Sequence, residues 1–445
     1  MKRIYMISLL ICIIIAMPAF VNCSDDDKTP EDPNTQTPLP PVEVDRSNLF
    51  GIHAVAEIGL GPGIGGGVHC DPLVTAEMCA DLCNIMGIKT YRLGMHHHWV
   101  LEYDDNEGKL KFMEDRVNDY KNYIALLRAN GIKKILCVSP TFMYPYGHER
   151  SIWYSIPDPK TEPELYWEFL ENIEEIYKLL GETFPDIDYW EVGNELNASF
   201  LGKNIVKNGY LGSLSLEENA PYLFSTEEIG QVTADLCFYA SKGLKAVGSK
   251  ALIATPGAYD VPATWDETLK YYNSFYDYIK SGNAPTSGKK SDGSRTVAAT
   301  TNPDDYIDYL CWHAYANGSR FDWLDHNEAI YRTAIDHDDM NRKALVSEFG
   351  YYDRHLKSYE EQIANSCVPD MMALADRIPA LESLYIFRMF NFVTVPEPTS
   401  PEQSFGLFYS PNQSQGAGPK PVAISLFYHF NGVEANSDPL FKYAK

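Results

Sequence analysis

The chain has 445 residues, of which 45% are hydrophobic and 22% charged, and its formal net charge at pH 7 is −24. So negative a balance argues against nucleic acid or an anionic membrane surface as the partner, and it disfavours a polyanionic substrate such as a uronate polymer. A neutral partner fits best. The length allows a large hydrophobic core in one to three domains.

The first 22 residues are typical of an export signal. Two basic residues precede the apolar run 4–15, which is shorter than the roughly 20 residues of a membrane-spanning helix. The stretch ending at Cys23 resembles a bacterial lipoprotein signal, and the acidic residues 25–27 resemble the surface-export signal of Bacteroidetes lipoproteins. This resemblance implies removal of residues 1–22, lipidation of Cys23 and display on the outer membrane. A periplasmic location and a plain solvated tether are the alternatives.

Residues 23–48 are rich in Asp, Pro and Thr and poor in large apolar residues. Such a composition cannot bury enough surface to fold, which predicts a disordered linker between the lipid and a folded domain at residues 49–445.

Seven of the nine cysteines lie outside the export region, and an odd, scattered set is no disulfide framework. Cys70, Cys79 and Cys83, with His69 beside them, are one candidate metal cluster. Cys79 and Cys83 stand one helical turn apart among apolar neighbours, however, which favours buried free thiols.

From residue 49 onward, short β-rich runs alternate with longer helical patterns. Most of the strand candidates are near-continuous apolar runs, as expected for parallel strands covered on both faces. They are residues 49–56, 90–94, 134–139, 188–194, 251–256, 308–315, 344–350 and 383–390. The clearest helical patterns cover residues 75–87, 114–131, 163–184, 225–248 and 264–282. Gly87, Gly131 and Gly248 stand where a left-handed C-cap is expected.

Eight strand-then-helix units predict an α/β fold, a single (β/α)8 TIM barrel. A doubly wound open sheet is the alternative. It is weaker because the glycine-rich stretch 59–67 contains Pro62 and lacks the helix that must follow a dinucleotide-binding turn at once. This stretch is better interpreted as a loop on the barrel rim.

Two glutamates are expected at the mouth of this barrel. Glu195 lies just after the fourth strand and Glu348 ends the seventh. The carboxyl ends of barrel strands form the active face, so both side chains should converge there. Paired carboxylates at that place suit glycoside hydrolysis, in which one is an acid and the other a nucleophile or base. Helix-cap or surface positions are the alternative.

With these residues the chain resembles glycoside hydrolase clan A, whose acid/base Glu follows an Asn at the end of strand four and whose nucleophile Glu ends strand seven. The similarity runs from Leu49 to Phe430 and is closest to family 39 or a neighbouring family, through the segments 91–133 and 419–430. It implies that Glu195 is the acid/base and that Glu348 is the nucleophile of a retaining reaction that needs no cofactor and no metal.

Further site residues follow from the same resemblance. Arg92 matches the strand-two arginine that holds the nucleophile, and Asn194 the amide that binds the sugar 2-hydroxyl. His313 and Tyr315 match strand-six residues that line the site, and period-two alternation puts both on one face. Glu191 is assigned to the barrel interior and not to chemistry.

The loops after strands two and three supply weaker candidates for sugar contacts, namely His97, Trp99 and Trp153. His97 is the middle one of three adjacent histidines, which point in different directions and therefore suit zinc poorly.

The sequence thus predicts a surface lipoprotein that hydrolyses a neutral β-linked polysaccharide, such as a β-glucan, β-mannan or β-xylan. An endo mode is favoured, because an enzyme displayed outside the cell meets polymer first. An exo-acting β-glycosidase is the first alternative, and a non-catalytic glycan-binding lipoprotein on a decayed barrel is the second. The expected partner is an oligo- or polysaccharide, with membrane contact only through the lipid anchor.

Overall fold

The computed structural model describes residues 38–54, 73–95, 100–104, 109–139, 155–201, 206–207, 224–316, 319–351, 360–391, 405–411 and 416–445. One compact unit spans Leu39–Lys445. None of the helices within the described ranges is both long and apolar enough to cross a membrane.

Eight parallel strands close into a barrel, which confirms the predicted fold class. Each strand pairs in parallel with its two neighbours, in the order β1-β12-β11-β10-β9-β7-β5-β2. The barrel strands are β1 (Phe50–Ala54), β2 (Thr90–Gly94), β5 (Lys134–Val138), β7 (Tyr189–Glu191), β9 (Leu252–Ala254), β10 (Tyr309–Tyr315), β11 (Lys343–Gly350) and β12 (Leu381–Phe387).

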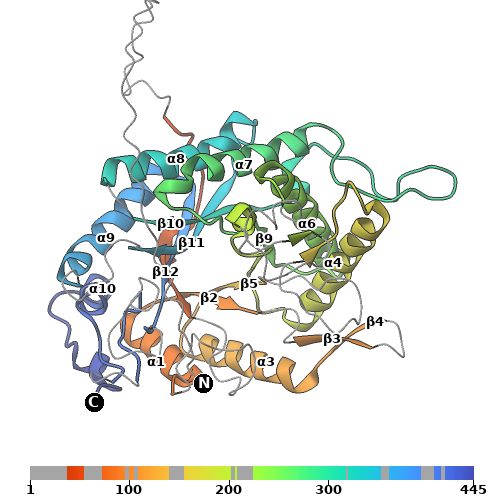
Figure 1. Cartoon of the computed structure of the whole chain (residues 1–445). Coiled ribbons are helices and arrows are strands. Elements are labelled where there is room, and N and C mark those ends of the chain that lie inside the picture. Colours follow the sequence, from red (N-terminus) through yellow and green to blue (C-terminus); the bar gives the residue numbers. More distant parts are fainter. Residues whose placement is uncertain are drawn as a thin grey trace, which may run out of the picture. The chain divides into compact units, whose positions relative to one another are not determined.

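Figure 1 shows the helices arranged around these central strands. They are α1 (Ala76–Met86), α3 (Glu114–Ala129), α4 (Pro163–Thr183), α6 (Thr226–Ala246), α7 (Trp265–Lys280), α8 (Arg320–Asp336), α9 (Glu360–Arg377) and α10 (Pro421–Asn431). Gly87, Gly131 and Gly248 all have positive φ just past a helix end, as predicted. A left-handed residue there lets the chain leave the helix while its last carbonyls are still hydrogen-bonded.

The apolar patterns that predicted these elements build two packed layers. One core cluster joins the outward faces of the strands to the helices, and a second, smaller cluster of strand residues fills the barrel. Cys79 and Cys83 lie buried in the first cluster as free thiols, as predicted. The barrel below its mouth is therefore solid, and substrate can only be held at the rim.

Smaller elements were not predicted from the sequence. Strands β3 (Leu101–Asp104) and β4 (Lys109–Phe112) form an antiparallel pair between β2 and α3. Strands β6 (Ser155–Ile156) and β8 (Val206–Lys207) pair in parallel. Within the described ranges there are also short 3-10 helices, namely η2 (Arg46–Asn48), η3 (Leu196–Leu201), η5 (Pro262–Thr264), η6 (Pro303–Asp305) and η9 (Asp438–Phe441).

The folded unit also includes residues 39–48, which composition had assigned to the linker. Arg46 is one reason, because its guanidinium donates hydrogen bonds to four backbone carbonyls around the end of α9 and the start of β12. Leu39 and Val42 also pack against the core cluster, and mean composition does not reveal such individual contacts.

Candidate active site

The two predicted glutamates meet at the carboxyl end of the barrel. Glu195 follows β7 and Glu348 lies near the end of β11. One carboxylate oxygen of each lies within 4.8 Å of the other, and His313 brings a ring nitrogen within the same distance of both. The side chain of Glu195 is 25% exposed and that of Glu348 7% exposed, so the first faces the opening more than the second.

A sharp turn after β7 positions Glu195. Gly193 has a φ of 105°, and Glu195 itself is left-handed with a φ of 52°. Its amide donates to the Gly257 carbonyl at 2.8 Å, and Asn194 bridges to the same glycine beyond β9. Non-glycine residues adopt this conformation at an energetic cost that the surroundings must offset. Through this turn, the amide of Asn194 and the carboxylate of Glu195 both lie at the barrel mouth directly after the apolar strand β7.

A β-bulge in β11 positions Glu348. Trp312 of β10 pairs with Val346, whereas the next residue, His313, pairs with Glu348, so Ser347 is left without a partner in that ladder. Adjacent strand residues normally point to opposite faces, but a bulge lets two neighbours turn the same way. Both Ser347 and Glu348 therefore reach groups inside the barrel mouth.

Arg92 connects the two strand ends. From the middle of β2, its completely buried guanidinium donates to Glu348 Oε1 at 2.6 Å and to Asn194 Oδ1 at 2.8 Å. It also donates two bonds, at 2.8 and 3.0 Å, to the carboxylate of Glu191. Its Nη1 lies 2.8 Å from His53 Nδ1, which accepts because the guanidinium has only donors.

The surroundings keep Glu348 ionised. Burial by itself raises the pKa of this carboxyl, but His313 and Arg92, with a smaller contribution from His53, outweigh burial and hold it well below its usual range. Tyr315 also donates its hydroxyl to Glu348 Oε2 at 2.5 Å, and a hydrogen bond to the charged form favours that form. Glu348 is thus a carboxylate at neutral pH.

His313 lies between the two glutamates. Its Nδ1 is 3.1 Å from Glu195 Oε1 and 3.6 Å from Glu348 Oε2. Burial lowers the pKa of this imidazole, but the two carboxylates outweigh burial and raise it above its ordinary value. The ring lies against Gly257, where any Cβ would collide with Cδ2 and Nε2.

The structure brings six of the predicted site residues together: Arg92, Asn194, Glu195, His313, Tyr315 and Glu348. The other candidates His97, Trp99 and Trp153, and the lipidation candidate Cys23, lie outside the described residues.

Four residues of the site were missed. They are His53, Glu191, Gly257 and Ser347. Glu191 was assigned to the barrel interior, where it lies buried, but not to the site. The available signal was the presence of a carboxylate in an otherwise apolar strand, because a fully buried charge must have a partner.

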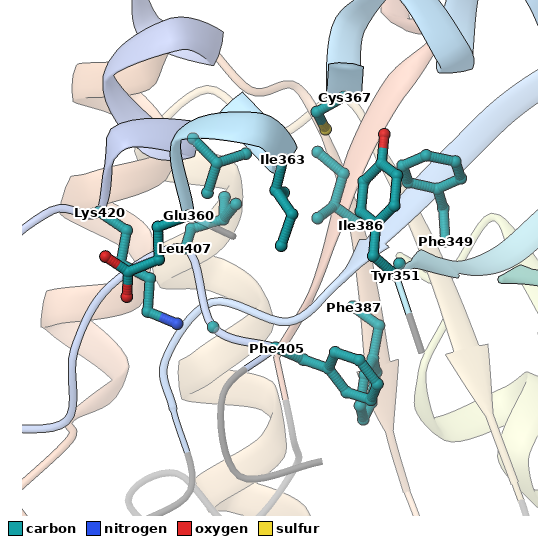
Figure 2. A pocket seen from close by; sticks show the side chains of 13 residues that line it. Phe349, Tyr351, Glu360, Ile363, Cys367, Ile386, Phe387, Phe405, Leu407 and Lys420 are labelled. Carbon is teal, nitrogen blue, oxygen red and sulfur yellow. The ribbon is translucent and has the colours of Figure 1, made fainter. Parts of the chain in front are cut away.

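Two phenylalanines form an aromatic border beside the site. Phe387 ends β12 with its ring 5.2 Å from that of His53, and Phe405 lies 5.6 Å from the ring of Tyr315. Behind them lies a cavity of about 50 Å³, shown in Figure 2, with Lys420 on its far side. Burial lowers the pKa of Lys420 to about 8, with Glu360 opposing. The cavity is much smaller than the roughly 300 Å³ of a usual ligand pocket, so it is no subsite for a sugar ring.

The same site also offers ligand atoms to a metal ion. Among the described residues, Glu195, His313 and Glu348 place three ligating atoms close together. Both oxygens of Glu348 already accept hydrogen bonds, one from Arg92 and one from Tyr315. A cation would have to displace these donors and face the charge of Arg92, so the arrangement suits acid–base and nucleophilic chemistry better.

No protein-family model and no curated protein matches this chain. Solved structures do match over most of their length. A family 1 β-glucosidase from Thermotoga maritima has 13% sequence identity and a TM-score of 0.54, and the match covers 88% of this chain and 98% of that one. A hyperthermophilic β-glucosidase from Pyrococcus furiosus has 13% identity and a TM-score of 0.51, covering 90% and 98%.

A third similar structure is a family 5 xyloglucan-specific endo-β-1,4-glucanase from a metagenomic library, solved with cellotriose. It has 16% identity and a TM-score of 0.50, with 87% of this chain and 96% of that chain covered. At these identities the likeness establishes the fold, a closed eight-stranded parallel barrel with surrounding helices.

Proposed function

We propose that this protein is a glycoside hydrolase of clan A that cleaves β-glycosidic bonds with retention of configuration. One observation carries the proposal, namely that oxygens of Glu195 and Glu348 lie within 4.8 Å of each other at the barrel mouth. Carboxyl groups about 5–5.5 Å apart are typical of retaining enzymes, whereas inverting enzymes need about 6.5–9.5 Å to admit a water molecule.

The first chemical step forms a glycosyl–enzyme ester. Glu348 attacks the anomeric carbon, a new C1–O bond forms, and the bond to the leaving oxygen breaks with its electron pair. Glu195, the more exposed of the two carboxyls, gives its proton to that oxygen. Asn194, fixed by Arg92, presents its amide nitrogen to the sugar 2-hydroxyl.

The second step releases the sugar. The carboxylate of Glu195 takes a proton from water, the resulting hydroxide attacks C1, and Glu348 departs as a carboxylate. Two inversions at one carbon give net retention. The donors on Glu348 stabilise the carboxylate both before attack and after departure.

The substrate class we propose is a neutral β-linked oligo- or polysaccharide. The net charge of −24 disfavours acidic polymers. The structural relatives include β-glucosidases and an endo-β-1,4-glucanase solved with cellotriose, so both exo and endo modes occur on this architecture. We favour the endo mode, on a lipoprotein anchored at Cys23 in the outer membrane, with an exo-acting β-glycosidase as the alternative.

The test is hydrolysis of a panel of β-glucans, mannans, xylans and galactans, with the anomeric configuration of the first-formed product followed by NMR. Glu195→Gln and Glu348→Gln should each abolish turnover. The matched control is Glu382→Gln, which neutralises a buried carboxylate bound by Lys134, Tyr189 and Tyr309. These partners all lie at the starts of their strands, so Glu382 is at the end of the barrel opposite to Glu195 and Glu348.

Azide assigns the two roles. It should restore activity to Glu348→Ala with an inverted glycosyl azide as product, and to Glu195→Ala with a retained one. Turnover that survives either glutamine exchange would refute the assignment. Glycan binding without turnover by the wild-type protein would favour the non-catalytic alternative.

A further inference from the structure

A second buried carboxylate, Glu191, holds the arginine of the site. It lies on β7 with no exposed surface and accepts two hydrogen bonds from Arg92, one at each oxygen. Its Oε1 also accepts from the Gly257 amide at 2.9 Å and the Ser347 hydroxyl at 3.0 Å. Glu191 is thus bound by Gly257, which also holds the backbone of Glu195, and by Ser347, which precedes Glu348 in the bulge.

Among the described residues, few charged groups surround Arg92. Burial, with the nearby guanidinium, lowers the pKa of His53 to about 4, so this partner is neutral at pH 7. Asn194 is an uncharged amide. The neighbouring thiols Cys137 and Cys311 have their pKa raised well above the ordinary value by burial, so they are neutral too.

Within the described part of the chain, the negative charges that pair with Arg92 are therefore the carboxylates of Glu191 and Glu348. His313, whose pKa is raised, and Tyr315 contact Glu348 and offer Arg92 no negative charge.

This balance changes during the proposed reaction. When Glu348 forms an ester with the sugar, its negative charge disappears, while Arg92 remains buried and protonated. An uncompensated charge in a protein interior is strongly unfavourable. We infer that Glu191 is the permanent counterion of Arg92, a positioning residue that keeps the guanidinium paired and in place while the nucleophile is consumed. This inference rests on the proposed function and extends it to a residue that never touches the sugar.

Glu191 has a second consequence for the free enzyme. Because one guanidinium is shared between two carboxylates, the charge of Glu348 is only partly compensated before reaction. Removing Glu191 would leave Arg92 to pair with Glu348 alone, which makes the nucleophile less reactive and the intermediate less stable. Both effects slow the formation of the ester, and neither requires a change in how the sugar first binds.

The experiment measures ester formation directly. The wild-type protein is treated with 2,4-dinitrophenyl 2-deoxy-2-fluoro-β-glycosides of glucose, galactose, mannose, xylose and cellobiose. The adduct is followed by intact-protein mass spectrometry and mapped to Glu348. Glu191→Gln should be labelled about 10- to 100-fold more slowly, with the reversible binding constant changed less than about threefold. If Glu191 mattered only for folding, its loss would not slow labelling while leaving the reversible binding constant nearly unchanged.

The matched control is Glu382→Gln, another buried barrel carboxylate, which should be labelled at the wild-type rate. Glu191→Asp keeps the charge but shortens the side chain, and should recover part of the lost rate. Wild-type labelling of Glu191→Gln would overturn this role and leave the proposed function intact. If that variant does not fold, Glu191→Asp decides instead, and a loss of reversible binding as large as its loss of labelling rate would overturn the role. Labelling of the wild-type protein by none of the five glycosides, combined with no turnover of the panel, would overturn both.

Discussion

Replacing Gly257 with alanine tests whether the site depends on the close approach of His313 to the backbone. A Cβ at position 257 would stand 2.5 Å from Ser347 Oγ and closer still to Cδ2 and Nε2 of His313. Ordinary contacts begin at 3.4 Å, so the imidazole would have to retreat by about 1 Å. Such a shift would disturb its 3.1 Å contact with Glu195.

The size of the effect follows from these distances. Overpacking a well-packed interior usually costs about 1–3 kcal/mol of stability. A displacement of about 1 Å in the catalytic geometry lowers the rate on the order of 100-fold. We therefore expect Gly257→Ala to lose about two orders of magnitude in kcat and a smaller, separate amount of stability.

The assay compares kcat and KM on the panel glycan that the wild-type protein cleaves best, together with unfolding in urea. Gly243→Ala is the matched control, because its Cβ would collide with the Glu174 carbonyl in the packing of α4 on α6. It should lower stability while kcat is kept. A Gly257→Ala protein with the kcat and stability of the wild type would refute the reasoning.

Two further predictions concern pH and export. The pKa of His53 is lowered to about 4, so between pH 6.5 and 4 the unfolded chain binds a proton at this residue that the folded protein does not, and stability falls as the pH falls through that window. His53→Asn keeps an acceptor for Arg92 but cannot titrate. The difference in its unfolding free energy between pH 7 and pH 5 should therefore be about 2 kcal/mol smaller than in the wild type. An equal difference in both proteins would contradict the lowered pKa of His53. Cys23→Ser should abolish the incorporation of labelled palmitate in a bacterial host, because the serine cannot form the thioether of a lipoprotein; unchanged incorporation would exclude lipidation at this residue.

The barrel could be predicted because its causes are local. A strand buried on both faces needs a short, nearly continuous apolar run, and a covering helix needs one apolar stripe. Both patterns are present in the sequence, and the eight predicted strands match the observed ones to within a few residues at each end. The hairpin of β3 and β4 was missed because its strands carry alternating charges such as Lys109 and Lys111 and bury little surface.

The partners of Arg92 could not be predicted in the same way. Glu191 and Glu348 are 99 and 256 residues away in the chain, and which strand residues share a height in the barrel depends on its stagger. The bulge at Ser347 adds to the difficulty, because strict alternation would put Ser347 and Glu348 on opposite faces.

The sequence alone determined the number and order of the barrel strands, and the two strand ends at which glutamates emerge, because these depend on neighbours in the chain. Only the tertiary structure decided that one guanidinium would bind Glu191, Asn194 and Glu348 together, and that Gly257 would leave room for His313. The physical reason is that a buried charge is tolerated only where its partners converge from several strands, and that convergence exists only once the barrel has closed.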